Sequence, residues 1–258
     1  MDLQLKGKTA IVTGGSAGIG LAITKALAAE GVTVTVPGRS KEKLNKALAG
    51  IINVKAIVAD PGTAEGAAAL IQQVPDTDIL VNNLGIYEPK PFAEITDADW
   101  LKIFEVNVLS GVRLSRHYFP RMLQRNWGRV IFISSESGVM TPPEMIHYGV
   151  TKSSQLAISR GLAEMTKGTA VTVNTVLPGP TRSEGIVDFL KNVSSAPNPT
   201  PEQAEKEFFE KHRSSSLLQR LIESEEIASL VAYIASPLSA ATNGAAIRAE
   251  GGLLRSIA

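Results

Sequence analysis

The stretch Thr13-Gly14-Gly15-Ser16-Ala17-Gly18-Ile19-Gly20 decides the fold that we expect for this chain. It follows an apolar, β-branched run, Thr9–Thr13, and opens a helical pattern, Ile19–Glu30. Glycines let a backbone approach a pyrophosphate closely, and the first N–H groups of a helix attract anions. The turn is therefore interpreted as a phosphate site, with an ordinary tight turn between strand and helix as the alternative. Its ligands would be Gly14, Ser16, Ala17, Gly18, Ile19 and Gly20.

Strand-like and helix-like stretches alternate along the rest of the chain. The further strand candidates are Val32–Val36, Val54–Val58, Ile79–Val81, Arg129–Ile133, Val171–Val176 and Ala246–Arg248. The helix candidates are about 18–30, 40–50, 63–74, 97–125, 145–167 and 224–235. Apolar strands separated by helices indicate parallel βαβ units that are covered on both faces. We expect an α/β protein with a Rossmann-type doubly wound parallel sheet of about seven strands.

The organisation that we expect is a single domain over residues 1–258, with no internal repeat. A segment at about 182–216, rich in Ser, Pro and Glu, is interpreted as a substrate-loop insertion after the sixth strand. Within it, residues 202–210 form a charged pattern with an apolar edge, which is typical of a helix. This helix could cover a substrate or could pack at a subunit contact.

Composition excludes several classes of function. The 26 basic and 25 acidic residues give a net charge of +1 with no long basic run, so we expect neither a nucleic-acid nor a membrane partner. The absence of cysteine excludes a thiolate nucleophile and a cysteine metal site, and the three histidines show no metal-ligand spacing. With no signal-peptide pattern and no apolar run of about 18 residues, the expected location is the cytoplasm.

The end of the second strand indicates the cofactor. In a dinucleotide-binding fold an acidic residue here holds the ribose 2′-hydroxyl, whereas an arginine accommodates a 2′-phosphate. The segment 36–40 has no carboxylate but contains Arg39 and Ser40, so the sequence predicts NADP(H) rather than NAD(H). A surface arginine in a turn is the alternative. Pro37 lies close enough to alter where the backbone places Arg39.

Polar side chains also follow the third and fourth strands. Asp60 would accept a hydrogen bond from an adenine amino group, or would begin a turn with Pro61-Gly62. Asn83 and Gly85 would line the cofactor crevice, although amides at this place can also join neighbouring strand ends. Asn107 interrupts an apolar helical pattern and needs a partner or a kink.

Ser135, Tyr148 and Lys152 carry the expected chemistry. Ser135 follows the fifth strand, where a hydroxyl can donate to a carbonyl oxygen, although the serines here could instead only make the turn. Tyr148 and Lys152 lie four residues apart and so share a helix face, and an ammonium beside a phenol favours the phenolate. Such a pair can exchange a proton with an alcohol or a carbonyl. Taken alone, the same spacing fits a surface pair.

Together these residues resemble the short-chain dehydrogenase/reductase superfamily in its single-domain branch. The resemblance covers nearly the whole chain and depends on the order and intervals of its motifs, Thr13–Gly20, Asp60, Asn82–Gly85, Asn107, Ser135, Tyr148-x-x-x-Lys152 and Asn174–Thr181. Leu84 stands where members usually have alanine, which would alter packing on the adenosine side. The resemblance also implies a homotetramer or homodimer, with 97–125 and 145–167 pairing across one two-fold axis.

The resemblance further implies a role for each site residue. Tyr148 would be the catalytic acid/base, and Ser135 would orient and polarise the substrate oxygen. Lys152 would lower the pKa of the tyrosine and bind the nicotinamide ribose, while Asn107 would hold a water in a proton relay. Pro178, Gly179 and Thr181 would flank the nicotinamide.

We expect an NADP(H)-dependent oxidoreductase acting on a small-molecule carbonyl or secondary alcohol. Two alternatives stay open, namely a catalytically silent nucleotide-sensing protein and a lyase, epimerase or dehydratase on the same scaffold. The substrate is not indicated. By position alone, the residues expected around it are Ile86, Tyr87, Met140, Ile146 and His147.

Overall fold

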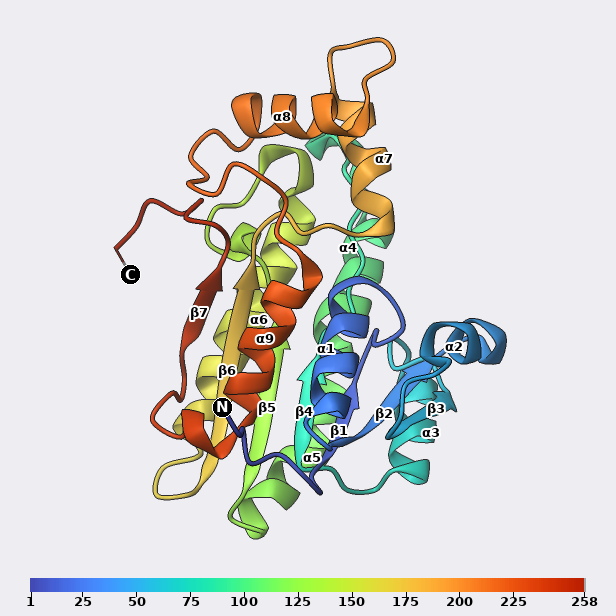
Figure 1. The fold of residues 1–258 in the computed structure, drawn as a ribbon, viewed down its shortest axis with the longest axis vertical. Helices are drawn as coiled ribbons and strands as arrows, with labels where there is room; N and C mark the ends of the chain where they lie inside the picture. Colours follow the sequence, from blue (N-terminus) through green and yellow to red (C-terminus); the bar gives the residue numbers. More distant parts are fainter. Residues whose placement is uncertain (258) are drawn as a thin grey trace.

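A seven-stranded parallel sheet forms the centre of the computed structural model, which describes residues 1–257 (Figure 1). The strand order is β3-β2-β1-β4-β5-β6-β7, and every neighbouring pair is parallel. The strands are β1 (Thr9–Val12), β2 (Thr33–Gly38), β3 (Val54–Val58), β4 (Ile79–Asn82), β5 (Gly128–Ile133), β6 (Val171–Pro178) and β7 (Ala246–Ala249). The predicted doubly wound sheet is confirmed, and each strand overlaps its predicted run.

Helices cover both faces of the sheet. On one face α1 (Gly18–Ala29) packs against α9 (Ser224–Ala235), and on the other lie α3 (Ala64–Gln73), α5 (Ser110–Gln124) and α6 (Ile146–Glu164) (Figure 1). Successive residues of β1 point to opposite faces, so Ala10 and Val12 join the core under α1 and α9 while Ile11 joins the other core. Both faces are therefore apolar, as parallel strands require. A short helix, α2 (Lys41–Leu48), inserts Leu44 into the first core.

The expected helix 97–125 is divided into three segments. They are α4 (Asp97–Phe104), a π-helical turn (Glu105–Leu109) and α5. The helical run is nevertheless continuous from Asp97 to Gln124, as expected. Asn107 lies in the π-turn with its side chain bonded outside its own helix, so the irregular turn occurs at the polar residue that interrupts the apolar pattern.

Two helices lie between β6 and α9, above the carboxyl ends of the strands (Figure 1). The second, α8 (Pro201–Lys211), is the charged helix expected at 202–210, and its apolar edge is buried through Ala204, Phe208 and Phe209. The first, α7 (Glu184–Val193), was not expected. Leu190 of α7 and Leu221 join that edge in a small separate core. No helix in residues 1–257 is both long and apolar enough to cross a membrane.

The strand order reverses between β1 and β4. From β1 the chain moves outward through β2 and β3, and from β4 it moves outward through β5, β6 and β7. Open parallel sheets bind ligands outside the carboxyl ends of their strands at such a reversal. The remaining helical elements are short 3-10 turns at Phe92–Glu94, Glu136–Gly138, Pro143–Met145 and Pro237–Ser239.

Candidate active site

The glycine turn between β1 and α1 is closely packed against the end of β4. Gly14 and Gly18 have positive φ angles of 64° and 48°. A Cβ atom on Gly20 would lie 2.2 Å from the Gly14 carbonyl oxygen, so this position admits only glycine. Ala17 is the N-cap of α1 and has no side-chain oxygen to accept from the first N–H groups of the helix. These donors are therefore left for a ligand or solvent.

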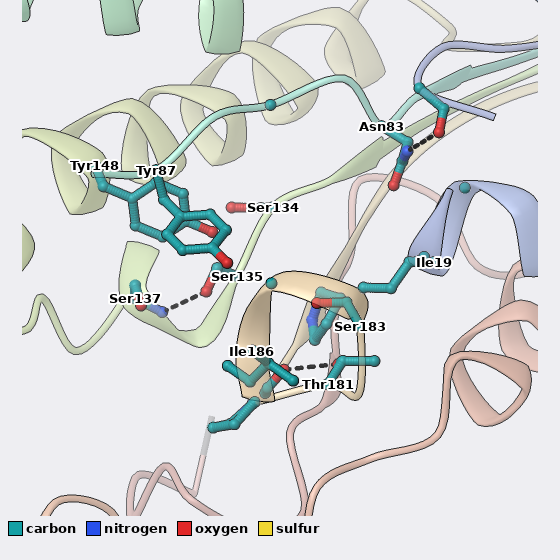
Figure 2. Close-up of a pocket in the computed structure, with 18 of the residues that line it drawn as sticks. Ile19, Asn83, Tyr87, Ser134, Ser135, Ser137, Tyr148, Thr181, Ser183 and Ile186 are labelled. Carbon is teal, nitrogen blue, oxygen red and sulfur yellow. Dashed lines mark hydrogen bonds between the residues drawn. The ribbon is translucent and has the colours of Figure 1, made fainter. Parts of the chain in front are cut away.

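Thr13 and Asn83 join the ends of β1 and β4. The Thr13 hydroxyl accepts hydrogen bonds from the N–H groups of Asn83 (2.9 Å) and Leu84 (3.0 Å) and donates to the Val81 carbonyl (3.2 Å). The Asn83 side chain donates to the Thr13 carbonyl oxygen (2.9 Å). Asn83 therefore joins the strands, which was one of the two expectations for it, and it also lines the neighbouring cavity (Figure 2).

A cavity of about 610 Å³ opens beside this turn at the reversal of strand order. Its volume lies within the range of small-molecule sites. It brings together most of the residues that the sequence singled out, namely Gly14, Ser16, Ala17, Gly18, Ile19, Gly20, Asn83, Gly85, Ser135, Tyr148, Pro178, Gly179 and Thr181. Leu84 also lines it. Residues of the insertion, including Ser183 and Ile186, form the opposite wall (Figure 2).

Tyr148 and Ser135 lie side by side in this cavity, with Tyr87 next to them (Figure 2). The two tyrosine rings meet edge to face with their centroids 6.3 Å apart. The Ser135 hydroxyl accepts from the Ser137 N–H (3.1 Å) and donates to Glu136 Oε2 (2.5 Å). Burial raises the pKa of Tyr148, the Glu136 carboxylate raises it further, and the Ser135 hydroxyl acts in the opposite direction.

Lys152 is buried behind Tyr148 on α6. Its ammonium donates to the Ile133 carbonyl (3.0 Å) and to Gln155 Oε1 (3.3 Å), and it lies 5.5 Å from the centroid of the Tyr148 ring. Burial lowers the pKa of Lys152 to about 8, while the Glu136 carboxylate acts to raise it. In the protein alone the pKa of Tyr148 is raised, and Lys152 is not among the causes. The lowering of the tyrosine pKa by Lys152 stays a prediction for the complex with cofactor.

Asn107 links three parts of the site. Its side-chain oxygen accepts from the Ile86 N–H (2.7 Å), and its amide donates to the Ile86 carbonyl (2.9 Å) and to the Thr151 hydroxyl (3.0 Å). Its main-chain carbonyl accepts from the amide of Gln155 (2.6 Å). Gln155 therefore connects Asn107 directly to Lys152, and sequence reasoning missed it. Its position three residues after Lys152, on the same face of the helix, was the available signal.

Comparison with known proteins agrees with this arrangement. The family model described as short chain dehydrogenase matches residues 8–192. The chain belongs to the short-chain dehydrogenase/reductase family. Uncharacterized oxidoreductases YvaG and YvrD of Bacillus subtilis are 49% and 45% identical to it over the full length of both chains. The L-sorbose reductase of Gluconobacter frateurii, solved with NADPH and L-sorbose, has a TM-score of 0.93 and 27% identity, with each chain fully covered.

Four predicted cofactor residues lie outside the cavity lining, as does the catalytic candidate Asn107. One of the four is Lys152, buried behind Tyr148, and the other three are Arg39, Ser40 and Asp60, at the ends of β2 and β3. Arg39 is exposed and follows β2 directly. The pairing of β2 with β1 ends at Thr35, so Pro37, which has no N–H, lies beyond the residues paired with β1. Ser40 is the N-cap of α2 and accepts from the Lys43 N–H (3.3 Å). Asp60 accepts from the Gly62 N–H (3.0 Å), which is the turn offered as its alternative. All three follow strands that end at the same edge of the sheet.

The substrate end of the cavity differs from the expected set. Of the five residues expected there, Tyr87 lines the cavity, whereas Ile86, Met140, Ile146 and His147 do not. His147 is buried, with its ring against Trp100. The charged lining residues that sequence reasoning missed are Glu136, beside Ser135, and Arg213, which follows α8. Nothing in the sequence placed residue 213 near residue 136, because the packing of the insertion brings them together.

Proposed function

We propose that this protein is an NADP(H)-dependent oxidoreductase that transfers a hydride between the nicotinamide and a carbonyl or secondary alcohol. One observation supports it above the others. The glycine turn, with its unpartnered helix N–H groups, and the Tyr148–Ser135 pair line one continuous cavity. A phosphate site and an acid/base pair in one cavity suit a reaction between a bound dinucleotide and a second small molecule.

The residues present fit a nicotinamide dinucleotide. Gly14 lets the turn pack closely against Asn83, and Gly18 carries no side chain on the side that faces Ser183 of the opposite wall. Ala17 leaves the N–H groups of α1 without a competing side-chain cap. We assign Pro178, Gly179 and Thr181 to the nicotinamide end, on the wall beside the insertion. When bound, the cofactor supplies or accepts the hydride.

In this proposal each of four residues, Asn107, Ser135, Tyr148 and Lys152, has a role. In reduction Tyr148 gives its phenolic proton to the substrate oxygen, and in oxidation its phenolate takes the proton from the hydroxyl. Ser135 donates a hydrogen bond to the same oxygen, for which its hydroxyl must rotate away from Glu136. Lys152 binds the nicotinamide ribose, and its charge favours the phenolate. Asn107 fixes the loop at Ile86 and belongs to the proton relay.

The preference for NADP(H) depends on Arg39. Its guanidinium is exposed at the end of β2, Ser40 and the start of α2 follow it, and no carboxylate occupies residues 36–40. A guanidinium beside a helix N-terminus suits a 2′-phosphate dianion. The similar L-sorbose reductase was solved with NADPH.

Calorimetric titration with NADP⁺ and, separately, with NAD⁺ tests this preference. We expect tighter binding of NADP⁺, with the preference lost in Arg39→Ala because the 2′-phosphate then has no guanidinium. Lys46→Ala, an exposed cation in the last turn of α2, is the matched control and should retain the preference. Equal binding of both cofactors to the unaltered protein would contradict the assignment. Binding of neither would contradict the oxidoreductase proposal itself.

The proposal extends to the whole assembly. We propose one domain over residues 1–258 that includes the insertion, located in the cytoplasm and working without a nucleic-acid or membrane partner. We also propose a homotetramer, in which α4, α5 and α6 pair across a two-fold axis. Light scattering of the purified protein would contradict this assembly by giving the mass of a monomer.

A further inference from the structure

Three charged side chains lie together at the substrate end of the cavity, where Glu136 and Arg213 line the wall and Glu144 lies beside Arg213. Glu136 follows the catalytic candidate Ser135, Glu144 lies in the 3-10 turn before α6, and Arg213 follows α8. Arg213 Nε lies 4.0 Å from Glu136 Oε1, and Arg213 Nη2 lies 3.6 Å from Glu144 Oε1. Both separations exceed hydrogen-bond length, so Arg213 forms ion pairs but no hydrogen bond with either carboxylate.

Arg213 is nine-tenths buried and is incompletely hydrogen-bonded. Its side chain is 10% exposed, its Nη1 donates to the His212 carbonyl (2.9 Å), and its guanidinium packs over the Phe208 ring. Its Nε has no hydrogen-bond partner among the described residues. Because a buried donor without an acceptor is costly, an unpartnered N–H in a cavity wall indicates an oxygen atom that a ligand would bring.

Glu136 offers acceptors at the same place. It receives the Ser135 hydroxyl on Oε2 (2.5 Å) and the Ser137 hydroxyl on Oε1 (3.3 Å). Burial raises the pKa of Glu136, whereas the Ser135 hydroxyl and the charge of Arg213 act to lower it. Because Oε1 and Arg213 Nε are 4.0 Å apart, one oxygen atom at about 2.9 Å from each can bond to both. Such an atom lies next to Ser135, and therefore next to the oxygen that reacts.

The chemistry of these groups separates three kinds of substrate. A hydroxyl can donate to Glu136 and accept from Arg213 at the same time. An apolar substituent would leave both groups desolvated and unsatisfied, which a site built for hydrogen bonding rejects strongly. A carboxylate would enter a cluster that already holds two carboxylates for one guanidinium, and like charges in a buried site repel.

We propose that Glu136 and Arg213 bind a hydroxyl on the carbon next to the reacting one, so that the substrate is a neutral α-hydroxy ketone or the corresponding vicinal diol. This inference rests on the proposed hydride transfer and names its substrate class. Glu136 would accept a hydrogen bond from that hydroxyl, and Arg213 would donate a hydrogen bond to its oxygen. Ser135 and Tyr148 act on the neighbouring oxygen.

Steady-state oxidation of NADPH with three probes tests the substrate class. The probes are a ketohexose (D-fructose and L-sorbose in separate assays), 2-hexanone, which lacks the hydroxyls, and 5-keto-D-gluconate, which adds a carboxylate. We expect kcat/KM for at least one ketohexose to exceed that for 2-hexanone by about 100-fold or more, and to exceed that for the keto acid. Arg213→Met should reduce kcat/KM for the ketohexose by about 10–100-fold, a loss at least tenfold larger than for 2-hexanone.

Matched variants separate recognition from folding. Arg213→Lys keeps the charge and the apolar stem but has no Nε, so it should lose ketohexose activity while retaining the thermal stability of the parent. Arg220→Met removes an exposed arginine of the same segment, whose partner is Glu226, and should leave the probe preference as it was.

The outcomes distinguish this inference from the proposed function. Turnover of 2-hexanone or the keto acid at rates above those of both ketohexoses would overturn the inference and leave the hydride transfer standing. An equal loss for all probes in Arg213→Lys would also overturn it. Turnover of none of the probes would overturn both.

Discussion

Gln155 determines how the buried Lys152 is held. The side chain of Gln155 is 2% exposed, accepts from the ammonium through Oε1 and donates to the Asn107 carbonyl through Nε2. Its amide therefore bridges the Lys152 ammonium and the Asn107 carbonyl. A side-chain amide with one donor and one acceptor engaged in this way holds the two groups at fixed spacing.

Gln155→Leu should uncouple Lys152 from Asn107. The ammonium then keeps only the Ile133 carbonyl, and the Asn107 carbonyl loses its side-chain donor. We expect a loss of unfolding free energy of about 1–3 kcal/mol, and a further fall in the pKa of Lys152 because a leucine solvates the charge less well. Urea unfolding measures the first effect, and the pH profile of kcat measures the second.

The control for Gln155 is its neighbour Ser154, which is bonded within α6 to the Val150 carbonyl. Ser154→Ala should change neither stability nor the pH profile by a measurable amount. A Gln155→Leu protein with the stability and pH profile of the parent would show that the hydrogen bonds of the amide contribute to neither property.

At the scale of elements, the junction between β1 and β4 positions the glycine turn. A single buried hydroxyl, that of Thr13, is bonded to three main-chain groups of the β4 strand and the loop after it. The turn follows Thr13 directly, so the distance from the helix N–H groups of α1 to the crevice depends on this hydroxyl.

Thr13→Val keeps the shape of the side chain but leaves the N–H groups of Asn83 and Leu84 without their acceptor. We expect a loss of about 2–3 kcal/mol in unfolding free energy, together with weaker cofactor binding. Thr172→Val is the matched control, since the buried Thr172 hydroxyl of β6 has no hydrogen-bond partner within residues 1–257 and its removal should be neutral or stabilising. Equal effects of the two changes in urea unfolding would contradict this role of Thr13.

Elements with a regular pattern could be predicted from the sequence, and elements fixed by distant contacts could not. Apolar β-branched runs located all seven strands, and Thr200-Pro201 with Gln203 begins α8 as a capped helix should begin. Asn107 was visible as a polar residue in an apolar pattern, but the π-turn was not predicted, and the partners of its side chain, Ile86 and Thr151, lie far away in the sequence. In the same way Tyr148 and Ser135 were identified by spacing, whereas Arg213 enters the site only through the packing of α8.

At the scale of the whole molecule, the buried Lys152 makes stability depend on pH. Its pKa is lowered from 10.5 to about 8 by burial. Below about pH 8 the ammonium is charged in both folded and unfolded protein, so the full cost of burial is present. Between about pH 8 and 10.5 the folded protein binds fewer protons, and this cost is relieved as the pH rises.

Urea unfolding of the parent and of Lys152→Met at about pH 7 and pH 9.5 measures this contribution. We expect the unfolding free energy of the parent, relative to that of Lys152→Met, to be larger at the higher pH by about 1–2 kcal/mol. A difference that stays constant between the two pH values would mean that Lys152 keeps an ordinary pKa in the folded protein.

The most direct test of the whole account is NADPH oxidation by Tyr148→Phe, measured together with NADP⁺ binding by calorimetry. The change removes one phenolic oxygen and leaves the ring that packs against Tyr87. The account predicts that turnover of any carbonyl substrate falls by about 100-fold or more, because the substrate oxygen loses its proton donor, while cofactor affinity stays nearly the same. Turnover close to that of the parent, with cofactor still bound, would contradict the assignment of Tyr148 as the acid/base.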